Sequence, residues 1–105
     1  MNKTMTINTY GETEELYAVI GHYSVNNNTA IQLMTTEYEP YVTLTVNIID
    51  LPEDTVCIDT NNFPEAIELI QQYNLGKLTG EYVISGFCEY PIVKLNMDIL
   101  KQYTR

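Results

Sequence analysis

The sequence is short of positive charge, and the shortage is concentrated in one long stretch. The chain has five basic residues, none of which lies between Lys3 and Lys77. The same stretch contains eleven carboxylates: Glu12, Glu14, Glu15, Glu37, Glu39, Asp50, Glu53, Asp54, Asp59, Glu65 and Glu68. Ordinary soluble domains intersperse both signs, so a surface of this kind projects a negative field that attracts cationic partners. The missing basic residues argue against direct nucleic-acid binding, which needs Lys and Arg against phosphates.

Cysteine is also scarce, and long apolar runs are missing. Cys57 and Cys88 are single residues within apolar, strand-like runs, which excludes a C-x-x-C redox pair or a cysteine metal site. We expect both to be unpaired thiols in a reducing cytoplasm. No run approaches the roughly 18 apolar residues of a membrane span, and the segment MNKTMTINTY lacks the apolar stretch of a signal peptide. The expected location is the cytoplasm of a bacterial host cell, without membrane contact.

Tryptophan is absent and phenylalanine occurs twice, whereas tyrosine occurs nine times. Tyrosine buries a ring while keeping a hydroxyl for water or a partner. Strands with one hydrated edge favour tyrosine, and so do protein interfaces, so the composition leaves both interpretations open. With 105 residues, an apolar fraction of 45% and a net charge of -9, the chain is expected to form a single domain over residues 1–105.

Alternating apolar residues and turn signals predict a chain made mostly of strands. The expected strands cover residues 4–10, 15–23, 30–35, 41–49, 56–59 and 81–90, with 91–95 as an edge strand because Pro91 cannot donate within a central one. The asparagines at 26–28 predict a hairpin turn. A turn is also expected at 79–80, and a bulge at 85–86.

One strong helix signal covers residues 63–74, where apolar residues recur at helical spacing. Asn62 and Glu65 have the spacing of a capping box, and Gly76 is expected to end the helix. A short helix is expected over residues 97–103. The predicted fold class is α+β, with a mostly antiparallel sheet of five to six strands packed on one main helix.

No residue pattern in the chain predicts catalysis or a bound metal. His22 lies at the end of a predicted strand, and no spacing selects a nucleophile or carboxylate to work with it as a general base. Neighbouring acids such as Glu14 and Glu15 point to opposite faces of a strand, so they do not converge as a glycosidase pair would. Residues 50–59 lack the alternating ligands and central glycine of a calcium loop. We therefore expect no enzymatic activity, no metal and no cofactor.

Two segments are dense in polar or backbone-directing residues: IDTNN at 58–62 and SGFCEYP at 85–91. We expect the first to close a turn through side chain to backbone hydrogen bonds, and the second to form a bulged strand with a tight corner. Together with AIQL at 30–33 and LTVNI at 44–48, they resemble an uncharacterised bacterial family of short acidic proteins. Members of that family are often carried on plasmids, phages and integrative elements of gut bacteria. The resemblance extends over residues 10–100.

The resemblance implies a context but no catalytic residues. Small acidic accessory proteins of mobile elements are often inhibitors of host defence, and anti-CRISPR and antirestriction proteins frequently present carboxylates where a nuclease expects phosphates. The resulting hypothesis is a non-enzymatic inhibitor that binds a basic CRISPR effector nuclease or restriction enzyme through Arg–carboxylate pairs. The alternative is an accessory protein-interaction domain of a mobile element, without nucleic-acid mimicry. A homodimer through an exposed edge strand is compatible with either function.

The partner-binding surface is expected among acids at predicted turns. The favoured patch is Glu37, Tyr38, Glu39 and Tyr41, because two acids and two aromatics occur there within five residues. The other candidates are Glu12, Glu14 and Glu15, followed by Asp50, Glu53 and Asp54. If alternate turns of an antiparallel sheet share an end, these two groups need not lie beside the favoured patch. Glu65 and Glu68 are expected to be solvated on the outer faces of the helix.

Overall fold

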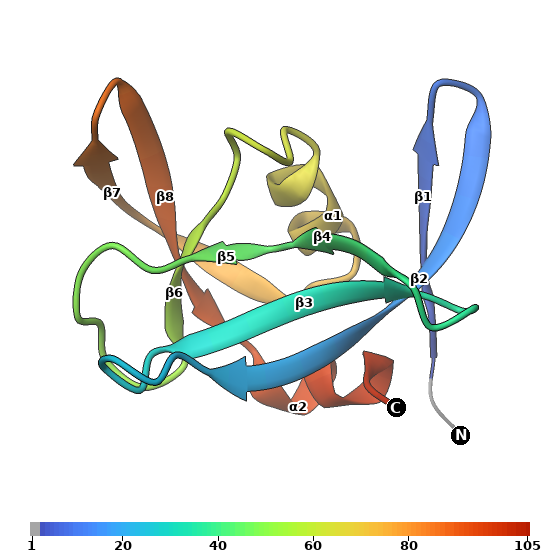
Figure 1. Cartoon of the computed structure of the whole chain (residues 1–105), viewed down its shortest axis with the longest axis horizontal. Coiled ribbons are helices and arrows are strands. Elements are labelled where there is room, and N and C mark those ends of the chain that lie inside the picture. The colour runs from blue at the N-terminus through green and yellow to red at the C-terminus, as the bar shows by residue number, and fades with distance from the viewer. Residues whose placement is uncertain (1–2) are drawn as a thin grey trace.

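The computed structural model describes residues 3–105, and its strands form two antiparallel sheets (Figure 1). The first has the order β1-β2-β3-β4, with bounds Met5–Thr9, Glu12–His22, Thr29–Thr35 and Pro40–Thr43. The second has the order β5-β6-β8-β7, with bounds Thr45–Val46, Thr55–Ile58, Cys88–Leu95 and Gly76–Ser85. Helix α1 spans Ala66–Gln72, and α2, Met97–Leu100, continues as a 3-10 helix over Lys101–Tyr103. The α+β class is confirmed, but the predicted single sheet is divided into two sheets of four strands each.

The chain passes from one sheet to the other at Leu44, the single residue between β4 and β5. Its N–H donates to the carbonyl of Ile31 in β3 at 2.9 Å, and its carbonyl accepts from the N–H of Asp59, just after β6, also at 2.9 Å. The strand predicted over residues 41–49 therefore changes partners midway. Because the backbone of one residue joins both sheets, the fully buried Leu44 side chain lies where the sheets share a core.

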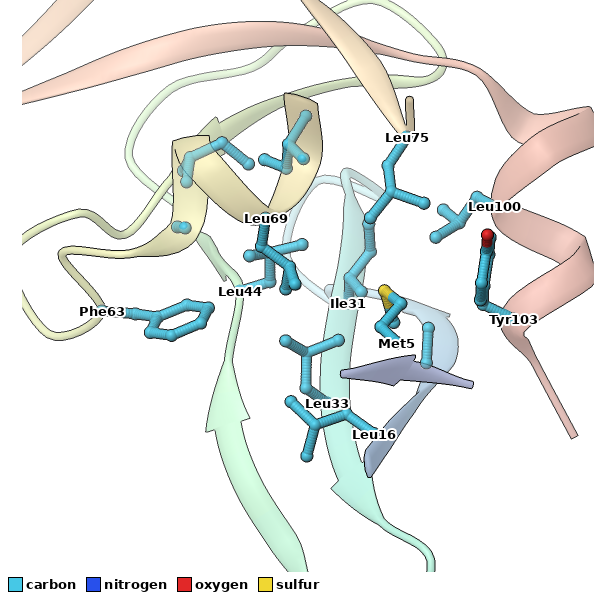
Figure 2. Packing of buried hydrophobic residues seen from close by; sticks show 14 of the residues in the cluster. Met5, Leu16, Ile31, Leu33, Leu44, Phe63, Leu69, Leu75, Leu100 and Tyr103 are labelled. Carbon is cyan, nitrogen blue, oxygen red and sulfur yellow. The ribbon is translucent and has the colours of Figure 1, made fainter. Parts of the chain in front are cut away.

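The main core lies between the two sheets and the helices (Figure 2). Leu16 and Ala18 of β2 face inward, while Tyr17 between them faces the opposite side, as strand alternation requires. Leu69 of α1 and Leu100 of α2 pack into this core, each from its own side (Figure 2). Full burial of such a side chain stabilises a fold by about 1.5–3 kcal/mol. A smaller cluster of Cys57, Val83 and Ile92 covers the other face of the second sheet.

Helix α1 is shorter than predicted and begins without a capping box. Asn62 instead donates its backbone N–H to the Asp59 carboxylate at 3.2 Å and its side-chain amide to the same carboxylate at 2.8 Å. These bonds close the turn expected at this segment, while Glu65 at the start of the helix makes no side-chain capping bond. Asn74, with φ of 57°, takes the left-handed position after the helix. Gly76, expected there, is already the first residue of β7.

Three predictions for the second sheet are wrong, one in β8 and two along the hairpin that β7 forms with it. Strand β8 lies between β6 and β7, so residues 91–95 are not on an edge strand. Pro91 is tolerated because β6 pairs with β8 only as far as Ile92. The bulge lies within β7, between Leu78 and Tyr82, where the sequence predicted a turn. Residues 86–87 form a hairpin turn instead of the predicted bulge, with Gly86 at φ of 62°.

A partly buried asparagine network joins the β2–β3 connection, residues 23–28, to the loop between β5 and β6. The predicted hairpin is confirmed, but its turn lies at residues 24–26 and not at 26–28. The Asn28 amide donates to the Asn47 side chain at 2.9 Å and to the Ile49 carbonyl at 2.7 Å. Its side-chain oxygen accepts from the Leu51 N–H at 3.2 Å. Asn28 is a buried polar residue with its side-chain donor and acceptor both satisfied. The network therefore fixes the end of the first sheet against the second.

Two hairpins project on either side of α1 in Figure 1. The β1–β2 arm, residues 6–15, extends beyond the point where β3 begins to pair with β2. The β7–β8 arm, residues 82–91, extends beyond the pairing of β6. Residues 3–105 include no helix of the length and apolarity needed to cross a membrane.

Candidate functional site

The glutamates at the start of β2 lie on the β1–β2 arm and not, as predicted, in a turn. Tyr10 and Gly11, with φ of 54° and 80°, are the two turn residues at the tip of the arm. Glu12 and Glu14 then lie on one face of β2 and Glu15 on the other. Glu14 pairs with Ile7 of β1, so both project from the face that carries the main core.

Tyr73, at the end of α1, attaches the helix to this arm. Its hydroxyl accepts a hydrogen bond from the Thr6 N–H at 2.7 Å and donates to the Thr6 carbonyl at 3.3 Å. Its ring packs edge-on against Tyr103, with ring centroids 5.5 Å apart. These contacts position α1 beside β1. The outward-facing Glu65 and Glu68 consequently lie next to the arm.

Two hollows lie along the arm, one between the arm and α1 and the other between the arm and Tyr41 of β4, and we treat them together as one groove. One, of about 260 Å³, is lined by Thr6, Ile7, Asn8, Glu65, Glu68, Leu69 and Gln72. The other, of about 330 Å³, is lined by Ile7, Thr9, Tyr10, Glu12, Glu14 and Tyr41. The two hollows share Ile7, which is nearly buried. We call this feature the acidic groove, because glutamates from β2 and from α1 line it and none of its lining residues is basic.

The acidic groove brings together three predicted site residues, Glu12, Glu14 and Tyr41, from separate parts of the chain. It also includes Glu65 and Glu68, which the sequence placed on the helix surface without a role. Glu65 and Glu68 are three residues apart, and this spacing indicates that they lie on the same face of a helix. What the sequence did not indicate was that this helix face borders the arm.

The favoured patch divides between two faces of the first sheet. Tyr38, in the β3–β4 turn, packs edge-on against Tyr17 on the face opposite the main core, with ring centroids 6.2 Å apart. The Arg105 guanidinium lies over both rings, 4.7 Å from the Tyr17 centroid and 5.6 Å from that of Tyr38. Tyr41 instead packs against the buried Phe63, with centroids 6.3 Å apart. The turn and Tyr41 therefore belong to different surfaces, and a cation lies beside the turn.

Glu37 and Glu39 are exposed on either side of Tyr38. The Thr35 hydroxyl accepts from the N–H groups of both, each at 3.3 Å, so it shapes the turn through the backbone and leaves the carboxylates in solvent. Glu15, on the outer face of β2, accepts from the Thr4 hydroxyl at 3.1 Å. These acids are accessible, but they do not line the acidic groove.

The third predicted group lies in the loop between β5 and β6 and is partly engaged by the fold. The Asp50 carboxylate accepts from the Asn26 amide at 2.9 Å. The Lys94 ammonium donates to the Glu53 carbonyl at 2.9 Å, which brings a basic group beside this loop. Asp54 has φ of 59°, and its carbonyl accepts from the N–H of Leu95 at 2.7 Å.

The remaining titratable groups lie outside the acidic groove. Both cysteines are free, as predicted, with Cys57 buried and Cys88 half-buried. Burial raises the pKa of the Cys57 thiol. A side-chain hydrogen bond with Cys88 raises the pKa of the Tyr90 hydroxyl, with a smaller contribution from desolvation. His22 is exposed at the end of β2. Across residues 3–105, no three His, Cys, Asp or Glu side chains gather as a metal centre requires.

Comparison with known proteins places the chain in a family. A family model described as a domain of unknown function, DUF4313, matches residues 18–105. The matched region begins within β2 and includes Glu65, helix α1 with Glu68, and the whole β7–β8 arm. No curated protein and no solved structure matches the chain. Because the match covers most of the chain, the expected membership of an uncharacterised family is confirmed, and the protein belongs to the DUF4313 family.

Proposed function

We propose that this chain is a non-enzymatic binding protein whose acidic groove takes a basic surface of a nucleic-acid-binding nuclease, of the CRISPR effector or restriction class. By occupying that surface, the chain would keep nucleic acid away from it. The observation that carries the proposal is that Glu65 and Glu68 line one hollow of the acidic groove and Glu12 and Glu14 line the other, with Ile7 common to both. All four glutamates lie in the stretch of sequence that has no lysine or arginine.

The chemistry of the groove suits a cationic partner. Carboxylates accept paired hydrogen bonds from arginine in the geometry that phosphates use. An ion pair gains little when its desolvation cancels the Coulomb attraction, so carboxylates alone would give weak binding. The groove also offers Tyr10, which is fully exposed at the tip of the arm, and the half-buried Tyr41. Tyrosine rings beside the carboxylates supply apolar contact area for the same partner.

The lining of the groove supports a binding role rather than a catalytic one. Its side chains are carboxylates, amides, hydroxyls and aliphatic groups, without histidine, cysteine or lysine. His22 lies on a different hollow, formed with the asparagine turn and Glu53. A general base or a nucleophile would have to come from one of the four glutamates, and none of them faces an orienting partner among the lining residues.

The proposal is tested by assaying DNA cleavage by a panel of purified CRISPR effector nucleases and restriction enzymes with increasing amounts of the protein. Each effector nuclease is assayed for cleavage with its guide RNA bound, and a tagged copy of the protein is used to capture each nuclease directly, with and without the guide. We expect at least one enzyme to be inhibited in proportion to its binding. Uninhibited cleavage by the whole panel at saturating protein would overturn the proposal.

The salt dependence of binding separates this function from the alternative, an accessory interaction domain of a mobile element. Binding through the carboxylates should weaken steeply as salt is raised from about 0.05 to 0.3 M, because added ions screen exposed charges. An interface made mainly by apolar side chains should respond little. A captured partner whose affinity is insensitive to salt would favour the accessory domain.

A further inference from the structure

The β7–β8 arm carries large apolar side chains that the fold leaves in solvent. Tyr82 is 59% exposed, Ile84 is 70% exposed, and Phe87 at the tip is fully exposed. Val83, between the first two, faces the opposite side and is buried in the smaller cluster with Cys57. Tyr82 and Ile84 therefore form an unpartnered apolar pair on one face of an edge strand.

The outer edge of β7 is open along the same residues, because β7 ends the order of its sheet. In the arm, Tyr82 lies opposite Pro91 and Ile84 lies opposite Glu89. Proline has no N–H, so Tyr82 and Pro91 cannot be a pair that exchanges two backbone hydrogen bonds. Bonded and non-bonded pairs alternate along an antiparallel ladder, so Val83 bonds to β8 and Ile84 does not.

It follows that the backbone N–H and carbonyl groups of Tyr82 and Ile84 point away from β8, toward the open edge. The two residues with exposed apolar side chains are thus also the two with unused backbone donors and acceptors. Such an edge is a template for another strand. The first part of β7, residues 76–81, is less suited to pairing with another strand, because Lys77 and the bulge with Gly80 interrupt it.

We propose that β7 pairs with β7 of a second copy of this chain, antiparallel, about a two-fold axis at Val83. In this register Tyr82 of each copy lies opposite Ile84 of the other, and each such pair exchanges two backbone hydrogen bonds. The register uses both outward-facing residues of each copy, and its hydrogen-bonded pairs, formed by Tyr82 and Ile84, lie outside the bulge between Leu78 and Tyr82. Cross-strand pairs of an aromatic and a β-branched residue also stabilise a sheet through their side chains.

The edge suits a second copy because the register is self-complementary and the local charge does not repel another copy. The acidic surface of one copy repels that of another, but β7 and β8 together carry two lysines and two glutamates, Lys77, Lys94, Glu81 and Glu89, and are neutral. In the proposed register Glu81 lies opposite Ser85 of the other copy, so no like charges face each other. The contact is short, so the dimer should dissociate on dilution. None of these residues lines the acidic groove, so the dimer does not depend on the proposed function.

The test measures the mass of the full chain by sedimentation or light scattering from micromolar to millimolar concentration. The wild type should move from monomer to dimer as concentration rises, and Ile84→Lys should stay monomeric over the same range. Val25→Lys is the control, because Val25 is 90% exposed in the β2–β3 turn and the change adds the same charge. It should dimerise like the wild type. A wild type that is monomeric throughout, or equal behaviour of the two variants, would overturn the proposal.

Amide hydrogen exchange gives a second readout that does not depend on a variant. The amides of Tyr82 and Ile84 should exchange more slowly as concentration rises, whereas the amide of Val83, already bonded to β8, should not change. A dimer that forms without slowing those two amides would contradict strand pairing at this edge.

Discussion

The close approach at Gly76 predicts a large effect from the addition of one methyl group. A Cβ at this position would lie 2.7 Å from the Lys94 carbonyl oxygen, 2.7 Å from Val93 Cγ1 and 3.2 Å from the Leu95 Cα. Real Cβ atoms essentially never show contacts under 3.0 Å. Two of these neighbours are backbone atoms of β8, one of the two central strands of the second sheet, and the Val93 side chain is fully buried. None of the three can move aside without disturbing the sheet.

Gly76→Ala should therefore force β7 away from β8 at the start of β7, where Gly76 pairs with Leu95. Overpacking of this kind costs about 1–3 kcal/mol, and the backbone contacts favour the upper part of that range. In a domain of this size, 2 kcal/mol corresponds to a decrease of roughly 8–16 °C in Tm. The measurement is urea unfolding followed by circular dichroism, with thermal unfolding as a check.

Gly21→Ala is the matched control, because Gly21 also lies in a strand but a Cβ there meets nothing within 4 Å. That change should be neutral or stabilise the protein by about 0.4–1 kcal/mol, since alanine restricts the unfolded chain. If Gly76→Ala unfolds at the wild-type urea concentration, or if both variants lose the same stability, the packing described for β7 on β8 is wrong.

Single contacts elsewhere also have measurable consequences. Tyr73→Phe removes the hydroxyl that bonds to the β1–β2 arm and should lower the free energy of unfolding by about 0.5–1.5 kcal/mol; an equal loss in the control Tyr103→Phe would contradict this. Asn28→Ala leaves buried partners unbonded and should cost about 1–3 kcal/mol in urea unfolding; wild-type stability would contradict the network. Burial raises the pKa of the Cys57 thiol, so the buried neutral thiol contributes to the stability of the folded protein. This stability is fully present below the unfolded thiol pKa of about 8.5 and is lost as pH rises through the folded pKa. In that alkaline range, the free energy of unfolding should fall less with pH in Cys57→Ala than in the wild type. A thiol reagent should label Cys88 before Cys57 in the native protein, and the reverse order would contradict the burial of Cys57.

Local patterns in the sequence predicted much of the fold, since alternation and turn residues act over a few positions. The hairpin between β2 and β3 and the short C-terminal helix, where Asn96 accepts from the Ile99 N–H at 3.3 Å, are of this kind. The change of sheet at Leu44 was not predictable in this way. Residues 41–49 continue one ordinary strand pattern. Only the hydrogen bonds of Leu44, to β3 on one side and to Asp59 on the other, divide this segment between the two sheets.

The candidate site depends on a still longer contact. Glu12 and Glu65 lie along one groove because the Tyr73 hydroxyl bonds to Thr6, a residue 67 positions away in the sequence. The sequence showed the acids and the absence of basic residues among them. It did not show which acids would meet, because that depends on how α1 packs against β1.

Paired charge reversals test the acidic groove most directly. Glu12→Lys with Glu14→Lys changes the groove, and Glu37→Lys with Glu39→Lys changes the exposed β3–β4 turn with the same spacing and the same shift in net charge. The measurement is the protein concentration that halves DNA cleavage by the inhibited nuclease, at about 0.15 M salt, for variants shown to unfold like the wild type. The groove pair should raise that concentration by about tenfold or more, and the turn pair should raise it much less. An equal loss of inhibition in both variants, or no loss in the groove variant, would contradict a partner-binding role for the acidic groove.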